Sequence, residues 1–157
     1  QLQVQVEGSS KSSIDLNFNH PVKELIWIGK PGAKGTKHGG PSTPSLVSNT
    51  AYTTSYQLKL NGHDRFAERP LSYFTRTQIN QHHTGYGSTS ICDAIAVYSF
   101  ALKPEEHQPS GTCNFSRIDN AQLKVLNGGT EPILTIYAVN YNVLRIMSGM
   151  GGLAYSN

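Results

Sequence analysis

Three residues in the second half of the chain have the side chains of a nucleophilic triad: His107, Ser110 and Asp119. In such a triad the histidine takes the proton of the serine hydroxyl while the carboxylate orients the imidazole ring. The serine of an α/β-hydrolase lies in a G-x-S-x-G turn between a strand and a helix, whereas Ser110 lies in the sequence QPSGT. We attribute the three residues to chance and predict no catalytic residue, so the protein is not expected to be an enzyme.

The histidines of the chain could bind a metal ion only if the fold gathered several of them. A cupin-type metal site combines a His-x-His pair with a carboxylate and a further histidine from facing strands, and the chain contains no His-x-His pair. His82 and His83 are adjacent, and adjacent side chains on a strand point to opposite faces, so they would not share one ion. The sequence therefore predicts neither a metal nor a cofactor.

The segment from Gly29 to Gly40 combines three lysines with five glycines and could be taken for a phosphate-binding loop. A loop of that kind has the pattern G-x-x-x-x-G-K-[ST], which this segment lacks. We interpret it as a long surface loop.

Four charged residues lie close together in the sequence: Asp64, Arg65, Glu68 and Arg69. Paired carboxylates can act as general acid and base. A neighbouring arginine, however, stabilises the ionised form of a carboxylate and suits a salt bridge better than proton transfer. We therefore predict that these residues form salt bridges with a structural role.

The composition of the chain limits its partners. Its 157 residues are typical of one domain with a well-formed core. Charged residues make up 15%, the formal net charge is +3, and the basic residues are scattered, so we predict no direct binding to nucleic acid. No stretch reaches the ~18 consecutive apolar residues of a transmembrane helix, and the first residues do not resemble a signal peptide, so we predict no membrane span. A surface with few charges suits close contact with neighbouring protein subunits.

Two cysteines and one sequon complete the list of reactive sites. Cys92 and Cys113 lack the neighbours of a zinc site, and we expect free, partly buried thiols. The sequon that begins at Asn114 lies among residues typical of a strand or strand edge, and we interpret it as a chance occurrence.

Alternating apolar and polar residues predict antiparallel strands along most of the chain. The clearest patterns cover residues 2–6, 14–18, 25–28, 56–60, 96–102, 123–125 and 133–147. The last pattern would span about 50 Å as one strand, so we expect a bend near Asn140 and Asn142, or two successive strands. The glycine-rich residues 149–152 should then form a flexible end.

Two further elements follow from single residues. Trp27 lies in one of the predicted strands, and its large side chain is expected in the core. Pro70 suits the first turn of a helix, and residues 71–81 predict a short helical connector. Asn61 and Gly62 form a dipeptide that is typical of a tight hairpin turn.

A rigid polar corner follows the strand in which Ala96, Tyr98, Phe100 and Leu102 should share one buried face. We name residues 104–111 the elbow. It begins at Pro104, continues through four polar residues and closes with Pro109, Ser110 and Gly111, which supply turn chemistry. We expect its backbone geometry to depend on its prolines and on Gly111.

The elbow and its flanks, YSFALKPEEHQPSGTCNFSRID at Tyr98 to Asp119, resemble the major capsid proteins of nucleocytoplasmic large DNA viruses, with an iridovirus-like branch as the suggested relative. Three other blocks occur in the order of that family: LNFNHPVKELIWI at Leu16 to Ile28, LNGHDRFAERPLSYFTRTQINQHH at Leu60 to His83, and YAVNYNVLRI at Tyr137 to Ile146. Together the blocks span most of the chain. The family has two tandem jelly rolls, and the blocks correspond to the second, carboxy-terminal one.

The resemblance implies an all-β fold: an antiparallel jelly-roll β-sandwich of about eight strands with a short helix in a connecting loop. It divides the chain into an entering strand and linker at residues 1–13 and one jelly roll at residues 14–157. It also implies a structural protein of an icosahedral virion, assembled in the host cytoplasm as homotrimeric, pseudo-hexagonal capsomers that contact neighbouring capsomers and minor capsid proteins.

Family-signature residues within these blocks are candidates for structural or subunit contacts. They are His20, Pro21, Trp27, Asp64, Arg65, Arg69, His82, His83, Pro104, Gln108, Pro109, Ser110, Gly111, Asn114, Arg117 and Asp119.

The alternative function is that of a stand-alone carbohydrate-binding module, because jelly rolls also occur in such modules and a fold does not determine a function. Sugar rings stack on exposed aromatic side chains, and Tyr52, Tyr56, Tyr73 and Tyr86 would be available for that role.

Overall fold

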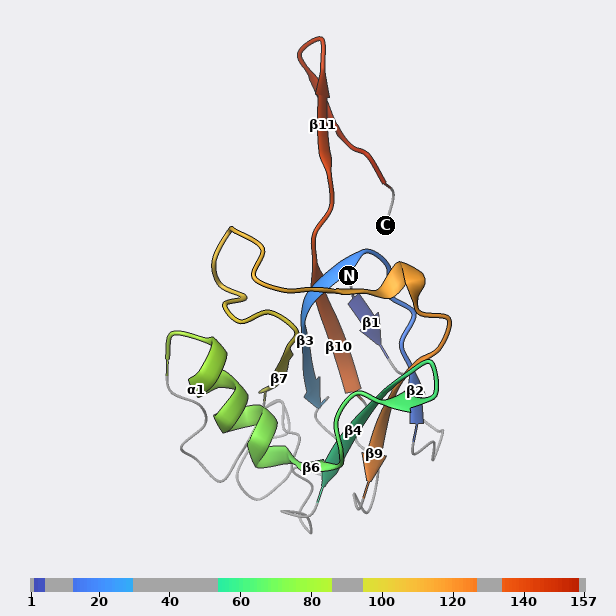
Figure 1. Cartoon of the computed structure of the whole chain (residues 1–157), viewed down its shortest axis with the longest axis vertical. Helices are drawn as coiled ribbons and strands as arrows, with labels where there is room; N and C mark the ends of the chain where they lie inside the picture. Colours follow the sequence, from blue (N-terminus) through green and yellow to red (C-terminus); the bar gives the residue numbers. More distant parts are fainter. Residues whose placement is uncertain (1, 5–12, 30–53, 86–94, 127–133, 156–157) are drawn as a thin grey trace.

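The computed structural model describes residues 2–4, 13–29, 54–85, 95–126 and 134–155. They form two antiparallel sheets that pack face to face, a helix beside them, and a projecting hairpin (Figure 1). The first sheet has the order β1 (Leu2–Val4), β10 (Leu134–Asn140), β3 (Pro21–Gly29) and β7 (Ile95–Ser99), with β8 (Cys113–Asn114) also on β3. The second has the order β2 (Ser13–Asp15), β9 (Ala121–Leu126), β4 (Ser55–Leu60) and β5 (His63–Asp64), with β6 (Arg69–Pro70) also on β4. The predicted antiparallel β-sandwich is confirmed.

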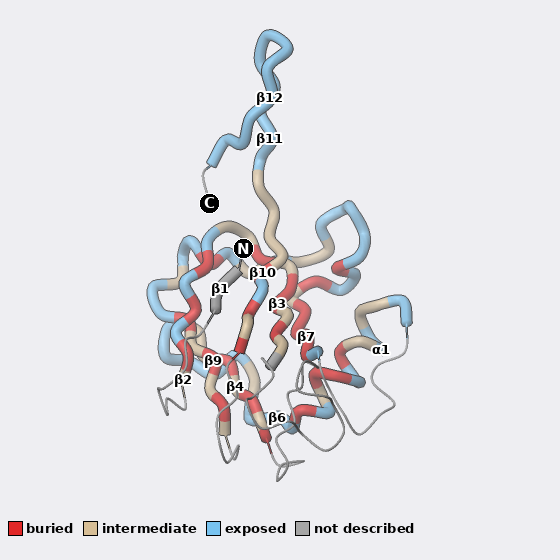
Figure 2. Tube along the Cα trace, turned by 180° about the vertical axis from the view of Figure 1, so that it is seen from behind, coloured by how far each residue is buried: buried red, intermediate tan, exposed pale blue. Residues whose placement is uncertain are grey.

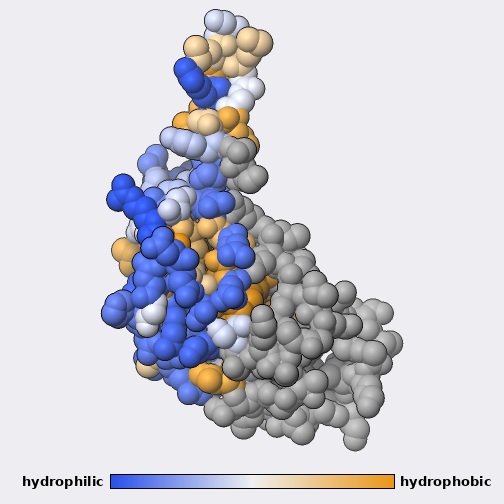
Figure 3. Space-filling model, turned by 90° about the vertical axis from the view of Figure 1, so that its right-hand side faces the viewer, coloured by the Kyte–Doolittle hydropathy of each residue, from blue (hydrophilic) through white to orange (hydrophobic). Residues whose placement is uncertain are grey.

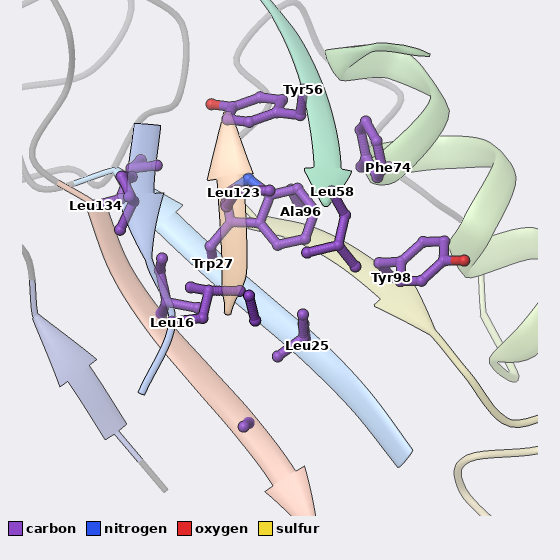
Figure 4. Close-up of a cluster of buried hydrophobic side chains, with 14 of the residues drawn as sticks. Leu16, Leu25, Trp27, Tyr56, Leu58, Phe74, Ala96, Tyr98, Leu123 and Leu134 are labelled. Atoms are coloured by element: carbon purple, nitrogen blue, oxygen red, sulfur yellow. The ribbon is translucent and has the colours of Figure 1, made fainter. Parts of the chain in front are cut away.

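The core lies between the sheets and is centred on Trp27, whose side chain is 1% exposed (Figure 4). Its ring centroid lies 5.4 Å from that of Tyr56 in the opposite sheet and 5.1 Å from that of Phe74 in the helix. Because the strands alternate, every second residue of β9 and β10 also points into this core. The prediction that Trp27 is a packing anchor is confirmed.

The predicted helical connector is confirmed and extends over residues 71–82. Its middle, η1 (Tyr73–Thr77), is a π-helix, and its end is α1 (Gln78–His82). Pro70 precedes it as the last residue of β6, paired with Ser55, rather than lying inside the first helical turn. The side-chain oxygen of Gln78 accepts a hydrogen bond from Ser99 N at 3.0 Å, so the helix covers the free edge of β7.

The strand before the elbow is shorter than predicted. It ends at Ser99, and Leu102 is 72% exposed, so the prediction that Leu102 shares the buried face was wrong. The amides of Phe100 and Ala101 both donate to the carbonyl of Lys23, at 2.9 and 3.3 Å. In a strand, the amides of successive residues point to opposite edges, so two successive amides that donate to one carbonyl mark the end of the strand.

The last apolar pattern divides as predicted. β10 ends at Asn140, and β11 (Leu144–Met147) begins after a three-residue break. The flexible end predicted for residues 149–152 was wrong, because β12 (Met150–Leu153) pairs with β11 through a tight turn. Ser148 and Gly149 have φ values of 52° and 77°, which is typical of the turn that joins two antiparallel strands with two residues. Figure 2 shows the whole hairpin as exposed.

Some predictions fall outside the described residues: the loop after Gly29, Cys92, Tyr52, Tyr86 and residues 5–12. β1 pairs with β10, so the entering strand joins the first sheet, while the boundary between residues 13 and 14 stays a prediction. Within the described ranges, no helix is long and apolar enough to cross a membrane.

Candidate assembly surfaces

The elbow is anchored on the sandwich by backbone contacts. The ammonium group of Lys23 on β3 donates to Pro104 O at 2.6 Å, and Pro104 is fully buried. The Ser110 hydroxyl accepts from Lys103 N at 2.9 Å and donates to Lys103 O at 3.2 Å. Ser110 therefore closes the loop and has a structural role.

Gly111 fits a position that no other residue would fill without strain. Its φ is +147°, and a Cβ added there would lie 2.7 Å from Phe100 O. The end of the elbow thus packs against the backbone that directly follows β7. Its tip, residues 105–109, is exposed and includes the candidates Gln108 and Pro109. The predicted dependence on Gly111 has a steric basis.

A cluster that we name the latch joins the elbow to the helix and to β3. It consists of Glu24, His83, Thr84 and Glu105. His83 Nε2 lies 3.1 Å from Glu24 Oε2, and His83 Nδ1 lies 3.1 Å from Glu105 Oε1. The Thr84 hydroxyl and amide also donate to Glu105, at 2.6 and 3.1 Å. The His83 ring therefore lies between the carboxylates of Glu24 and Glu105 and joins β3 to the elbow.

The contacts of the latch lower the pKa of Glu105. The hydrogen bonds from Thr84, first from its hydroxyl and then from its amide, lower the pKa of Glu105, and the contact with His83 adds to that effect. Hydrogen bonds that favour the ionised carboxylate stabilise the fold wherever that carboxylate is charged.

We expect Glu105→Gln to lower the free energy of unfolding at neutral pH, with an effect that disappears in acid. The folded pKa of Glu105 is lowered from its ordinary value of 4.5, so the stabilisation is present above that value and is lost as pH falls through the folded pKa. Urea unfolding of both proteins between pH 7 and pH 3, about the range of carboxyl titration, checks this. Glu106→Gln removes an exposed carboxylate paired with Lys103 and is the control. An effect of Glu105→Gln that stays constant across this range would contradict the assignment.

His82 and His83 lie at the end of the helix rather than on a strand, so the predicted reason for their separation was wrong. His82 Nδ1 lies 3.0 Å from Leu102 O, while His83 contacts the two carboxylates of the latch. The His82 ring thus contacts the backbone before the elbow, while the His83 ring contacts side chains of β3 and of the elbow. Among the residues that the structure describes, no group of three or more histidine, cysteine, aspartate or glutamate side chains is placed to hold a metal ion.

The predicted turn at Asn61 and Gly62 is confirmed, with φ values of 50° and 80°. The Asn61 side-chain oxygen accepts hydrogen bonds from the amides of Asp119 and Asn120, at 2.9 and 3.2 Å. This turn therefore holds Asp119, while Ser110 is bonded within the elbow. No contact joins Asp119, Ser110 and His107, each of which the structure describes.

The salt bridge predicted for Asp64 is present, but its partner is a lysine rather than a neighbouring arginine. Asp64 forms its salt bridge with Lys59 across the hairpin, at 3.1 Å, and not with Arg65. The guanidinium of Arg69 lies over the ring of Tyr73, 5.4 Å from its centroid. Lys59 and Asp64 lie opposite each other on the paired strands β4 and β5, so their side chains are close enough to form an ion pair although a turn separates them in the sequence.

The beginning of β3 lies beside β8, and the residues around this pair form a second corner. Pro21 pairs with Asn114, and His20 N donates to the Ser116 hydroxyl at 2.9 Å. The Asn114 side chain accepts from Ser116 N at 3.1 Å and so caps a short 3₁₀ helix, η2 (Phe115–Arg117). Asn114 therefore has a capping role, and Arg117 is exposed at the end of that helix.

Cys113 is a free thiol of intermediate exposure, as predicted. Burial raises its pKa, which keeps the thiol protonated and unreactive.

The tyrosines proposed for sugar binding do not form a platform in the described part of the chain. Tyr56 is fully buried, and burial raises the pKa of its hydroxyl. Tyr73 is covered by Arg69 on one side and meets Phe74 edge to face. No described feature favours the carbohydrate-binding alternative.

The projecting hairpin is the surface that the sequence prediction missed. Every residue of β11 and β12 is exposed, and Leu144, Ile146 and Leu153 are 64%, 69% and 61% exposed. In Figure 3 hydrophobic and neutral side chains predominate on it, whereas hydrophilic ones cover much of the described surface below. The Ser-Gly pair between Met147 and Met150 could have predicted this hairpin, because Ser-Gly is typical of a tight turn.

Comparison with known proteins gives consistent results along the whole chain. A family model described as large eukaryotic DNA virus major capsid protein matches residues 1–152. The major capsid protein of Pyramimonas orientalis virus is 48% identical over 179 residues, which cover 100% of this chain and 42% of that protein. An iridovirus-like relative, the major capsid protein of Rana tigrina ranavirus, is 24% identical and covers 88% of this chain.

A solved structure agrees. The PBCV-1 virus capsid, a quasi-atomic model, matches with a TM-score of 0.72 and 36% identity, over 100% of this chain and 50% of that chain. The predicted jelly-roll fold is thereby confirmed. The chain spans half or less of the length of the Pyramimonas orientalis virus protein and of the PBCV-1 capsid chain.

Proposed function

Because this chain belongs to the family of large eukaryotic DNA virus major capsid proteins, we propose that it is part of a subunit that forms homotrimeric, pseudo-hexagonal capsomers of an icosahedral virion. The observation that carries the proposal is the structural match to a capsid protein over the full chain, at 36% identity. A likeness in both sequence and structure is stronger than a shared fold, which alone is compatible with many functions.

The proposal extends to the position of the chain within the subunit. The chain corresponds to half of the PBCV-1 capsid chain, and we assign it to the carboxy-terminal one of two jelly rolls. Its partners are then copies of itself, neighbouring capsomers and minor capsid proteins. Its place is the capsid shell, assembled in the host cytoplasm.

The described surface suits such a role. The sandwich presents a rigid body, while the elbow tip and the hairpin project from it (Figure 1). Shells are built from many modest contacts repeated by symmetry, so projecting elements on a rigid body are sufficient and no chemical reaction is needed.

The test uses protein from purified virions. We expect light scattering to give the mass of a trimer, negative-stain images to show a hexagonal outline, and mass spectrometry of the denatured protein to show a polypeptide about twice as long as this chain, as in the relatives it matches. A protein that is absent from the virion shell would contradict the function. A dimeric or monomeric capsid protein would contradict the trimer.

A further inference from the structure

The beginning of β3 contacts both projecting elements of the molecule, the elbow and the hairpin. We name residues 19–23 the junction. Tyr141, which precedes β11, donates its backbone N–H to Pro21 O at 2.9 Å. The ring of Tyr155, which follows β12, lies 6.0 Å from the His20 ring between centroids. Both ends of the hairpin are therefore held at the junction, and in Figure 1 the hairpin rises above the start of β3.

The elbow is held at the same junction by Lys23. The carbonyl of Lys23 accepts from the amides of Phe100 and Ala101, so it fixes the backbone that leads to the elbow. The ammonium group of Lys23 donates to the carbonyl of Pro104, the first residue of the elbow, at 2.6 Å. A short hydrogen bond from a charged donor is about twice as strong as one between neutral groups. One residue of the junction therefore fixes both the approach to the elbow and its beginning.

The same ammonium group also contacts the hairpin. It lies 5.6 Å from the centroid of the Tyr141 ring, within the ~6 Å at which a cation and an aromatic face attract each other. Lys23 thus shares its ammonium group between a carbonyl of the elbow and a ring at the start of the hairpin. A displacement of either partner moves the ammonium group away from the other, so the two contacts depend on each other.

His20 gives the junction a strained backbone. Its φ is 68°, in the left-handed region that residues other than glycine seldom adopt. The contacts that hold this conformation come from η2: His20 N donates to the Ser116 hydroxyl at 2.9 Å, and His20 O accepts from Phe115 N at 3.1 Å. Strained backbone held by its surroundings is typical of segments that change conformation. The junction therefore combines shared contacts with a strained residue.

We propose that the junction couples the elbow to the hairpin, so that a contact which orders one of them also orders the other. The coupling passes through the Lys23 ammonium group, which Pro104 O and the Tyr141 ring share. Such coupling is reciprocal, because the free energy by which the hairpin orders the elbow equals that by which the elbow orders the hairpin. The inference goes beyond the proposed capsid function and does not depend on it. In a shell, a contact through one of these elements would prepare the other for its own contact.

The test measures hydrogen exchange of backbone amides by mass spectrometry in the full-length protein that contains this chain. Lys23→Met keeps the apolar stem of the side chain and removes the ammonium group. Tyr141→Leu changes only the hairpin side of the coupling. We expect exchange in residues 102–111 to become at least about threefold faster in both variants, because the elbow opens more often when the shared contact is lost. The double variant should exchange like Lys23→Met alone, since both substitutions remove the same contact.

Tyr137→Leu is the matched control, because Tyr137 is another partly exposed tyrosine near the hairpin but pairs with Ile26 rather than with the junction. Its elbow should exchange as in the unmodified protein. Unchanged exchange of the elbow in Tyr141→Leu overturns the inference, and so does a double variant in which the two effects add. An equal effect of Tyr137→Leu also overturns it, since the whole sheet would then have loosened. If Lys23→Met does not fold, Tyr141→Leu and its control decide alone.

Discussion

Gly111→Val is expected to lower the free energy of unfolding by about 2–6 kcal/mol. A side chain at φ +147° costs ~1–3 kcal/mol in backbone strain. The new Cβ would also lie 2.7 Å from Phe100 O, a backbone atom that cannot rotate away, and such overpacking costs a further ~1–3 kcal/mol. Urea denaturation followed by circular dichroism measures the loss. Assembly yield should fall with it.

Gly85 offers a matched control. Its φ is +155°, close to that of Gly111, yet a Cβ there would meet nothing within 4 Å. Gly85→Val therefore contains the strain without the overlap, and its effect should stay within ~1–3 kcal/mol. Equal effects at both positions would show that the contact with Phe100 O does not matter.

Trp27→Ala is expected to cost ~3–5 kcal/mol, the range for removing a large buried aromatic side chain. Trp27 is 1% exposed and lies between Tyr56 and Phe74, so its loss would leave a cavity that touches both sheets and the helix. The denaturation midpoint in urea gives the change. The dependence of the unfolding free energy on urea concentration should stay the same, because about the same surface is exposed on unfolding.

Leu102→Ala is the comparison for that substitution. Leu102 is as hydrophobic as a core residue but is 72% exposed, so its removal should change stability by less than about 0.5 kcal/mol. If Trp27→Ala cost no more than Leu102→Ala, the aromatic cluster would not be the centre of the core.

The alternation of apolar residues was enough to predict the sandwich, because a half-buried strand leaves a period of two in its own sequence. Trp27 and the Asn61-Gly62 turn were predicted for similar reasons, since bulk and turn chemistry are local properties. Leu102 was misplaced because its pattern continues past Ser99, while the end of the strand is set by Lys23, a residue of another strand. The sequence near Leu102 does not indicate that such an acceptor is present.

The surfaces were harder to predict than the core. Glu24, His83 and Glu105 form the latch from three distant segments, and no spacing rule connects them. The elbow was recognised because prolines and Gly111 fix it locally. The apolar hairpin was taken for a flexible end because glycines usually indicate freedom, whereas here Ser148 and Gly149 form the turn and the following glycines lie in a strand.

The order of strands in the two sheets has a kinetic consequence. β2 pairs with β9, and the hydrogen bond from Gln122 to Asp15 joins residues 107 positions apart. The bond from Asn140 to Asn19 spans 121 positions. Each such pairing closes a long loop before it gains any contact, so folding is slow, on the order of milliseconds to seconds. During that time unpaired strand edges can join other copies wrongly. Under the proposed capsid function, each newly made subunit would therefore have to complete its sheets before it meets its neighbours, which would separate synthesis from assembly in time.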